Sequence, residues 1–175
     1  MPKQDLPAPL VLVVDDDARA RKLAKTAFSD RDCAVVDVAD ADDAVWEMRS
    51  APGIDLLFTD VKLSTINDDD TSGMRLGNYV KDIRPDIPVA LYSTRFYEGE
   101  LDTALDASAR DRFDIVLARG GPEWKDAKVL NDCVALATQY RDRRFADAAR
   151  RSDGSAGAHI TVMREFVVGG TSRAS

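Results

Sequence analysis

The sequence predicts an α/β protein with a doubly wound, five-stranded parallel sheet. Two observations predict this class. Short apolar runs alternate along the chain with stretches whose apolar residues recur at helical spacing. The runs also show little polar–apolar alternation, which is typical of strands that helices cover on both faces. Because crossovers between parallel strands are right-handed, the doubly wound sheet is the favoured topology.

The first half of the chain contains three of these apolar runs. Residues 10–14 (LVLVV) form a continuous run, and the helical spacing that follows predicts a helix over 18–28. Residues 33–38 (CAVVDV) are short and rich in β-branched side chains, which favours a strand. A helix is expected over 41–48, and residues 55–59 (DLLFT) predict the third strand.

The second half repeats the alternation. A helix is predicted over 72–83, ending before Pro85 as helices tend to. Residues 87–92 (IPVALY) indicate the fourth strand, and residues 99–109 a short amphipathic helix. Residues 113–118 (FDIVLA) indicate the fifth strand.

A Gly-Gly-Pro break precedes one long helix, expected from residue 122 to about 150. We expect one domain over residues 8–150, followed by a linker and tail over 151–175, where SDGSAGA is rich in glycine, alanine and serine. The stretch after the long helix is too short for a helix-turn-helix module, so we expect no direct gene regulation.

Composition limits the classes of partner. A net charge of −7 in 175 residues disfavours nucleic-acid binding, because phosphates repel an acidic surface. No stretch approaches the ~20 apolar residues that span a membrane, and the N-terminus has no signal-peptide core. Cys33 and Cys133 lack metal-type spacing and indicate buried thiols in a reducing compartment. We therefore expect a cytoplasmic protein that binds neither nucleic acid nor membrane.

Polar side chains follow four predicted strands at their carboxyl ends. Asp15 and Asp16 follow the first strand and Asp60 follows the third. Ser93 follows the fourth strand and Arg119 the fifth. Ligands of doubly wound sheets bind beyond the carboxyl ends of the strands, so we expect these side chains to share a pocket.

Three aspartates in one pocket require compensation. Two carboxylates ~5 Å apart repel by about 3 kcal/mol at an effective dielectric constant near 20, so they either take up protons or surround a cation. Mg²⁺ fits, since it prefers hard oxygen ligands and often binds carboxylates together with phosphate. A carboxylate beside Mg²⁺ can also act as the nucleophile in phosphoryl transfer. The alternative, that Asp15, Asp16 and Asp17 merely cap the first helix, suits Asp17 but leaves Asp60 and Ser93 unexplained.

Three stretches resemble the response regulator receiver domain of bacterial two-component signalling. LVVDDDARAR (12–21) is similar to the first strand and acidic pair of that family, DLLFTD (55–60) to its phosphoacceptor strand, and IPVALYST (87–94) to its fourth strand with a switch hydroxyl. The resemblance covers about residues 8–145. It implies a flavodoxin-like fold with strand order 2-1-3-4-5. The length of the last helical pattern adds an extended C-terminal helix to this fold.

The resemblance also implies roles for individual residues. Asp60 would accept phosphate from a sensor histidine kinase or a phosphotransfer protein. Asp15, Asp16, Asp60 and the backbone carbonyl of Lys62 would hold Mg²⁺. Ser93 would bind the phosphoryl group and pull the following loop inward. That movement would change a face that a downstream protein or a second copy reads.

Three departures from the family pattern stand out. Leu63-Ser64 replaces the usual Met-Pro, and the loop reaches Gly73 about five residues late. We interpret the added aspartates of this loop, 68–70, as solvent-exposed loop residues rather than as metal ligands. The usual lysine after the fifth strand is absent; Arg119 is the nearest cation and either binds phosphate in its place or points into solvent. Val116 occupies the position of the switch aromatic, while Tyr92 and Phe113 are expected in the core.

The sequence is compatible with two functions. The first is a phosphorylatable stand-alone receiver that signals through protein contacts and is not an enzyme. The second is a degenerate receiver that acts as a phosphorylation-independent interaction or dimerisation module, which the missing lysine, the missing aromatic and the enlarged loop favour. A free-standing enzyme has little support, because the sequence shows neither a glycine-rich phosphate loop nor a nucleophile–histidine pair.

Overall fold

The computed structural model describes residues 6–63, 71–93, 111–117 and 127–153. Within these ranges the chain forms five strands and four helices. In chain order they are β1 (Leu10–Val14), α1 (Ala18–Ser29), β2 (Ala34–Val38), α2 (Ala41–Ser50), β3 (Ile54–Asp60), α3 (Ser72–Ile83), β4 (Val89–Tyr92), β5 (Ile115–Leu117) and α6 (Ala127–Asp153).

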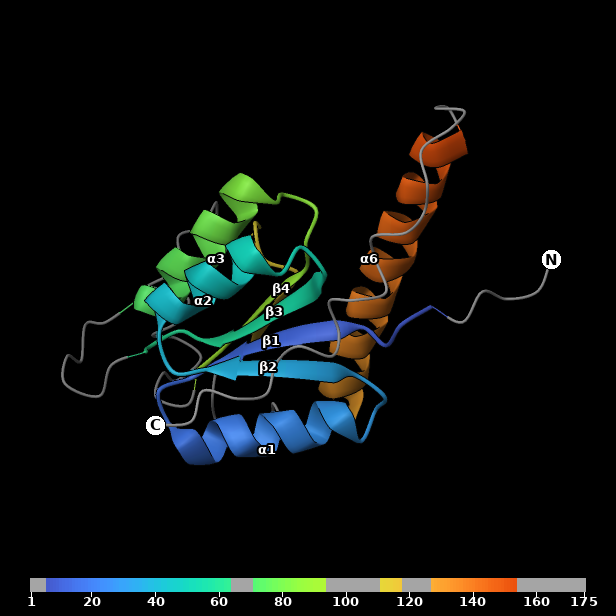
Figure 1. Cartoon of the computed structure of the whole chain (residues 1–175). Helices are drawn as coiled ribbons and strands as arrows, with labels where there is room; N and C mark the ends of the chain where they lie inside the picture. Colours follow the sequence, from blue (N-terminus) through green and yellow to red (C-terminus); the bar gives the residue numbers. More distant parts are fainter. Residues whose placement is uncertain (1–5, 64–70, 94–110, 118–126, 154–175) are drawn as a thin grey trace, which may run out of the picture. The chain divides into compact units, whose positions relative to one another are not determined.

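The five strands form one sheet in the order β2-β1-β3-β4-β5. Every neighbouring pair is parallel, and Figure 1 shows the helices on both sides of the sheet. The predicted fold class, strand order and C-terminal helix are therefore confirmed. The predicted bounds of the strand at 10–14 and of the helix at 72–83 match β1 and α3 residue for residue.

Each face of the sheet has its own apolar core. Leu12 and Val14 of β1 pack in the core beneath α2 and α3. Val11 and Val13 point to the opposite core, which α1 and the first half of α6 cover. Because β1 and β3 pair in parallel, their carboxyl ends lie at the same edge of a sheet that is covered on both faces.

The edge strands are less buried than the sequence indicates. Residues of β2 and β5 are mostly half-exposed, because each strand has a neighbour on one side only. β4 begins at Val89 rather than residue 87, since Pro88 has no N–H to donate. β5 begins at Ile115, because the Asp114 carboxylate accepts the Val89 amide at 2.9 Å in place of a strand bond. Cys33 lies before β2 and donates its amide to Phe28 at the end of α1.

Several expected features lie outside the described residues. They are the helix at 99–109, the Gly-Gly-Pro break, the start of the long helix, and most of the tail. The chain divides into two compact units, Met1–Arg143 and Arg144–Ser175. The described part of the second unit is the last stretch of α6. The domain boundary near residue 150 stays a prediction.

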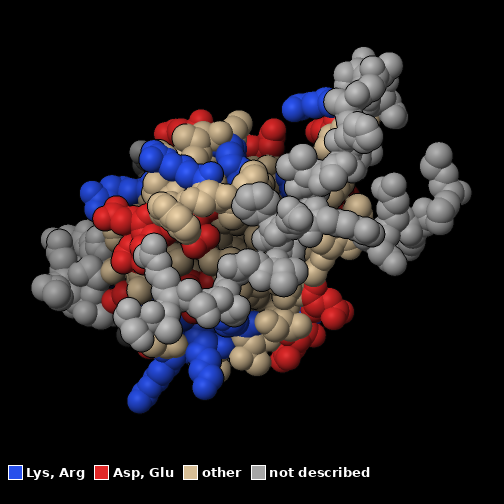
Figure 2. Space-filling view, viewed as in Figure 1, with Lys and Arg blue, Asp and Glu red and all other residues tan. Residues whose placement is uncertain are grey.

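The surface of the described residues carries charges of both signs, as Figure 2 shows for one face. α1 has four basic residues and no acidic one, and two of the four, Arg21 and Lys25, form ion pairs with Asp37 of β2. Among the helices of the described ranges, none has the length and apolar character to cross a membrane.

Candidate metal and phosphoryl site

Asp60 is the last residue of β3 and is almost completely buried, with 2% of its surface exposed. It lies opposite Tyr92 in the register of β3 and β4. Its Oδ1 accepts the Lys62 amide at 3.4 Å. Lys62 itself is also buried. The chain therefore places a carboxylate at the end of a central strand, where pairing with Tyr92 of β4 fixes the position of its main chain.

Asp15 and Asp16 follow the neighbouring strand β1. The Asp17 amide donates to Asp15 Oδ1 at 2.7 Å, and the Tyr92 hydroxyl donates to Asp15 Oδ2. One nitrogen of Arg21, Nη1, donates to the carbonyl oxygens of Asp15 and Asp16 at 2.6 and 3.2 Å. The turn that carries the acidic pair is thus held by side chains from α1 and β4.

Asp17 has a different role from its two neighbours. It is the N-cap of α1, with its carboxylate accepting the Arg19 amide at 2.8 Å. Helices favour such a side chain at this position because it satisfies one of their free amides. The capping interpretation is thus confirmed for Asp17 alone.

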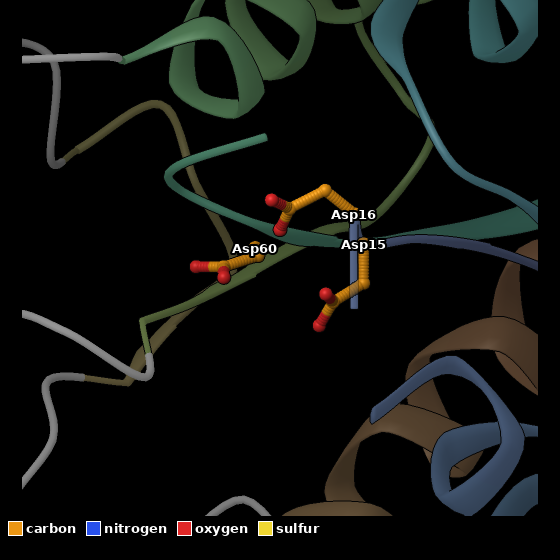
Figure 3. Close-up of side chains that lie close together, drawn as sticks. All are labelled: Asp15, Asp16 and Asp60. Atoms are coloured by element: carbon orange, nitrogen blue, oxygen red, sulfur yellow. The ribbon is translucent and has the colours of Figure 1, made fainter. Parts of the chain in front are cut away.

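The carboxylates of Asp15, Asp16 and Asp60 converge. One oxygen from each lies within 4.8 Å of the others, and Figure 3 shows the three side chains beside one another at the ends of β1 and β3. Burial, followed by the charge of Asp15, raises the pKa of Asp60 to about 7. Burial also raises the pKa of Asp15. The site thus concentrates negative charge that a cation would relieve.

A small divalent cation fits this donor set. The three converging ligand atoms are all hard carboxylate oxygens, and two of the three side chains are buried. Mg²⁺ prefers such oxygens and fills its remaining positions with water or phosphate. Within the described residues this is the one acidic cluster with suitable ligand spacing.

Ser93 follows β4 directly and is buried, with 3% of its surface exposed. Its amide donates to the Leu117 carbonyl of β5 at 3.1 Å. Ser93 therefore lies one residue beyond Tyr92, the strand partner of Asp60. Arg119 and the loop aspartates 68–70 lie outside the described residues.

Tyr92, Phe113 and Val116 lie on or beside the last two strands of the sheet. Tyr92 and Phe113 are buried, as expected for the core. Val116 is half-buried in β5 and packs against the core beneath α2 and α3. The residue expected at the switch position is thus a half-buried aliphatic side chain.

Sequence reasoning missed three residues that shape the site: Tyr92, Arg21 and Gly73. Tyr92 was assigned to the core alone, yet its hydroxyl reaches Asp15. A signal was present, since a buried tyrosine hydroxyl nearly always needs a partner and this one precedes Ser93 at a strand end. A Cβ on Gly73 would lie 1.7 Å from the Asp60 carbonyl oxygen, so α3 can approach the site only with glycine there.

The sequence matches the model of the response regulator receiver domain family over residues 11–114. The chain belongs to this family, whose domains act in two-component signalling. No curated protein matches the chain.

Solved structures agree with this fold. NtrX from Brucella abortus, crystallised with ADP, has a TM-score of 0.60 at 24% identity, over 85% of this chain and 30% of the NtrX chain. A receiver domain protein from Clostridium thermocellum gives 0.57 at 18% identity, over 78% of this chain and 97% of its own. TrrA from Thermotoga maritima, in complex with Mg²⁺ and beryllofluoride, gives 0.57 at 18% identity, over 71% and 97%. The chain therefore spans under a third of the length of NtrX.

Proposed function

We propose that the protein is a phosphorylatable receiver that accepts a phosphoryl group on Asp60 and signals through protein contacts. The donor would be a sensor histidine kinase or a phosphotransfer protein, and the acceptor of the signal a downstream protein or a second copy. The observation that carries this proposal is the convergence of three carboxylate oxygens within 4.8 Å at the carboxyl edge of the sheet. We propose a cytoplasmic switch rather than an enzyme.

The metal would be Mg²⁺, held by Asp15, Asp16, Asp60 and the backbone carbonyl of Lys62. When bound, the ion would neutralise charge on the transferring phosphoryl group. TrrA, which shares the fold, is described with Mg²⁺ and beryllofluoride, which supports this choice. The site of this chain offers the oxygen ligands that the ion prefers.

The chemical step would be a displacement at phosphorus. A carboxylate oxygen of Asp60 attacks, a new O–P bond forms, and the bond from phosphorus to the donor's histidine nitrogen breaks with the electron pair leaving on nitrogen. The Lys62 amide, which contacts Asp60 Oδ1, limits rotation of the nucleophile. Asp60 is 2% exposed before the reaction, so little bulk water competes with the donor for the nucleophile.

The response would pass from Ser93 to the neighbouring strand. Ser93 would donate its hydroxyl to a phosphoryl oxygen and draw the following loop toward Asp60. Its amide donates a hydrogen bond to the Leu117 carbonyl of β5, so a movement of Ser93 would shift the end of that strand. We propose Arg119, which follows β5 in sequence, as the substitute for the family lysine.

Labelling by acetyl phosphate, a small phosphodonor, tests this function. The wild-type chain with Mg²⁺ should gain the mass of one phosphoryl group, and chelation of the metal should abolish the gain. Asp60→Asn should gain none. Asp86→Asn, which removes an exposed carboxylate in the turn before β4, is the matched control and should label as the wild type does. Absence of labelling in the wild type, or equal labelling of Asp60→Asn, would refute the proposal.

One observation favours a second candidate, the degenerate receiver that interacts without phosphate. Val116 packs against the core from β5 and has no aromatic ring to swing between two positions. Backbone NMR shifts with Mg²⁺ and beryllofluoride distinguish the two functions. Large changes in β4 and β5 support the switch, whereas changes confined to the residues around Asp60 support the constitutive module.

A further inference from the structure

We propose that Tyr92 is a positioning residue that orients Asp15 and makes the site select Mg²⁺ over Ca²⁺. This inference rests on the proposed function, because it concerns the metal site of that switch. It adds a residue from a third strand, β4, to the carboxylates that β1 and β3 supply. Its basis is the hydrogen bond from the Tyr92 hydroxyl to Asp15 Oδ2.

The Tyr92 side chain has a fixed position. It is 1% exposed and stacks on Phe58 of β3, with ring centroids 4.4 Å apart and an interplanar angle of 24°. Its backbone carbonyl accepts the Val61 amide at 2.8 Å. Both the ring and the main chain of Tyr92 are thus locked to β3. A hydroxyl on such a frame holds its acceptor at a defined place.

The Asp15 carboxylate is held at both oxygens. The Asp17 amide occupies one lone pair of Oδ1 and the Tyr92 hydroxyl one lone pair of Oδ2. Because each oxygen accepts a hydrogen bond, rotation of the carboxylate about the Cβ–Cγ bond of Asp15 is restricted. It would meet an ion with a single oxygen or through a water molecule. Bidentate binding would require a rotation that stretches the bond from Tyr92.

This restriction separates the two common divalent cations. Mg²⁺ needs a compact octahedral shell and keeps several waters, so a single oxygen or a water-mediated contact suits it. Ca²⁺ takes more oxygen ligands and commonly uses a carboxylate in bidentate fashion. A carboxylate fixed by Tyr92 therefore serves the smaller ion, whereas one released from Tyr92 can rotate to serve the larger.

Calorimetric titration of the full chain with Mg²⁺ alone and with Ca²⁺ alone tests the inference. Tyr92→Phe removes only the hydroxyl, and we expect the ratio of the Ca²⁺ to the Mg²⁺ dissociation constant to fall about three- to tenfold. Tyr79→Phe is the matched control. Its hydroxyl accepts from Arg49 on the opposite face of the sheet, and the ratio should stay that of the wild type.

The outcomes separate this inference from the proposed function. A wild-type chain that binds no Mg²⁺ contradicts the function itself. A wild-type chain that binds Mg²⁺, with an unchanged ratio in Tyr92→Phe, contradicts only the role of Tyr92. If Tyr92→Phe fails to fold, as judged by circular dichroism, both titrations are repeated at a lower temperature at which it is folded, and the same fall in the ratio is expected. A fall of similar size in Tyr79→Phe would assign the change to general destabilisation and overturn the inference.

Discussion

A Cβ atom on Gly73 would lie 1.7 Å from the carbonyl oxygen of Asp60. The Gly73 amide also donates to the Val61 carbonyl at 3.0 Å, so the first turn of α3 is bonded directly to the end of β3. No side chain fits between them. The approach of α3 to the acidic site depends on this one glycine.

Gly73→Ala should therefore destabilise the protein by about 3 kcal/mol or more, because the backbone of β3 or α3 must move to admit the methyl group. Urea unfolding measures the change. Gly53→Ala is the matched control, since a Cβ there meets nothing within 4 Å, and its change should stay within about 1 kcal/mol. Equal effects of the two substitutions would contradict the close approach.

The stability of the metal-free protein should fall as the pH rises from about 4 to about 7. The folded-state pKa of Asp60 lies near 7 against an ordinary 3.8, so the folded state binds more protons than the unfolded state in this window. The contribution is fully present below pH 4 and lost as the pH passes the folded pKa. Asp60→Asn should flatten the curve and raise stability at pH 7.5 by a few kcal/mol.

Urea unfolding in a chelating buffer at several pH values measures this dependence. Asp86→Asn provides the control, since Asp86 is an exposed carboxylate outside the acidic site. It should leave the slope between pH 5 and 7 close to that of the wild type. A flat wild-type profile would show that Asp60 titrates normally.

Arg21 should support the metal site through the main chain. Its Nη1 donates to the carbonyl oxygens of Asp15 and Asp16, so Arg21→Met leaves both without this partner while keeping the aliphatic stem. We expect Mg²⁺ affinity to fall about three- to tenfold, as measured by calorimetry. Arg19→Met changes an exposed residue of the same helix and should have no such effect. Matching losses in both variants would point to net charge instead.

Arg84 should contribute more to stability than an exposed arginine does. Its Nη2 donates to the Ile54 carbonyl at 2.7 Å and to the Tyr140 hydroxyl at 3.3 Å, which ties the ends of α3 and β3 to α6. Arg84→Met should lower the free energy of unfolding by about 2 kcal/mol. Arg112→Met, which breaks an exposed ion pair with Asp82, should cost about 0.5 kcal/mol or less. Similar costs for both would contradict this difference.

The fold was predictable from the sequence because strongly apolar strands and periodic helices leave little choice of class. β1 has a continuous aliphatic run ended by aspartates, and α3 has regular spacing before Pro85, so their bounds were correct. The predicted fourth and fifth strands were longer than β4 and β5. A strand needs backbone hydrogen-bond donors and a neighbouring strand as well as apolar residues. Pro88 and the carboxylate of Asp114 remove those donors locally.

The site was predictable only in part. Aspartates at the ends of buried strands are easy to recognise in a sequence. A charge at such a position is costly unless a hydrogen-bond partner or a cation compensates it. The contacts of Tyr92 and Arg21 are three-dimensional, because a hydroxyl in β4 and a guanidinium in α1 reach the turn after β1 only once the sheet is assembled. Sequence spacing does not encode such distances.

Because both thiols are buried, their reactivity reports local opening of the core that contains them. Cys33 and Cys133 are free and buried in the core on the α1 side of the sheet, and burial raises the pKa of each, that of Cys133 to about 12. The reactive thiolate is therefore scarce in the native state at neutral pH. Alkylating reagents should modify these cysteines only when α1 and α6 separate from the sheet. The rate of alkylation therefore reports how often this side of the domain opens.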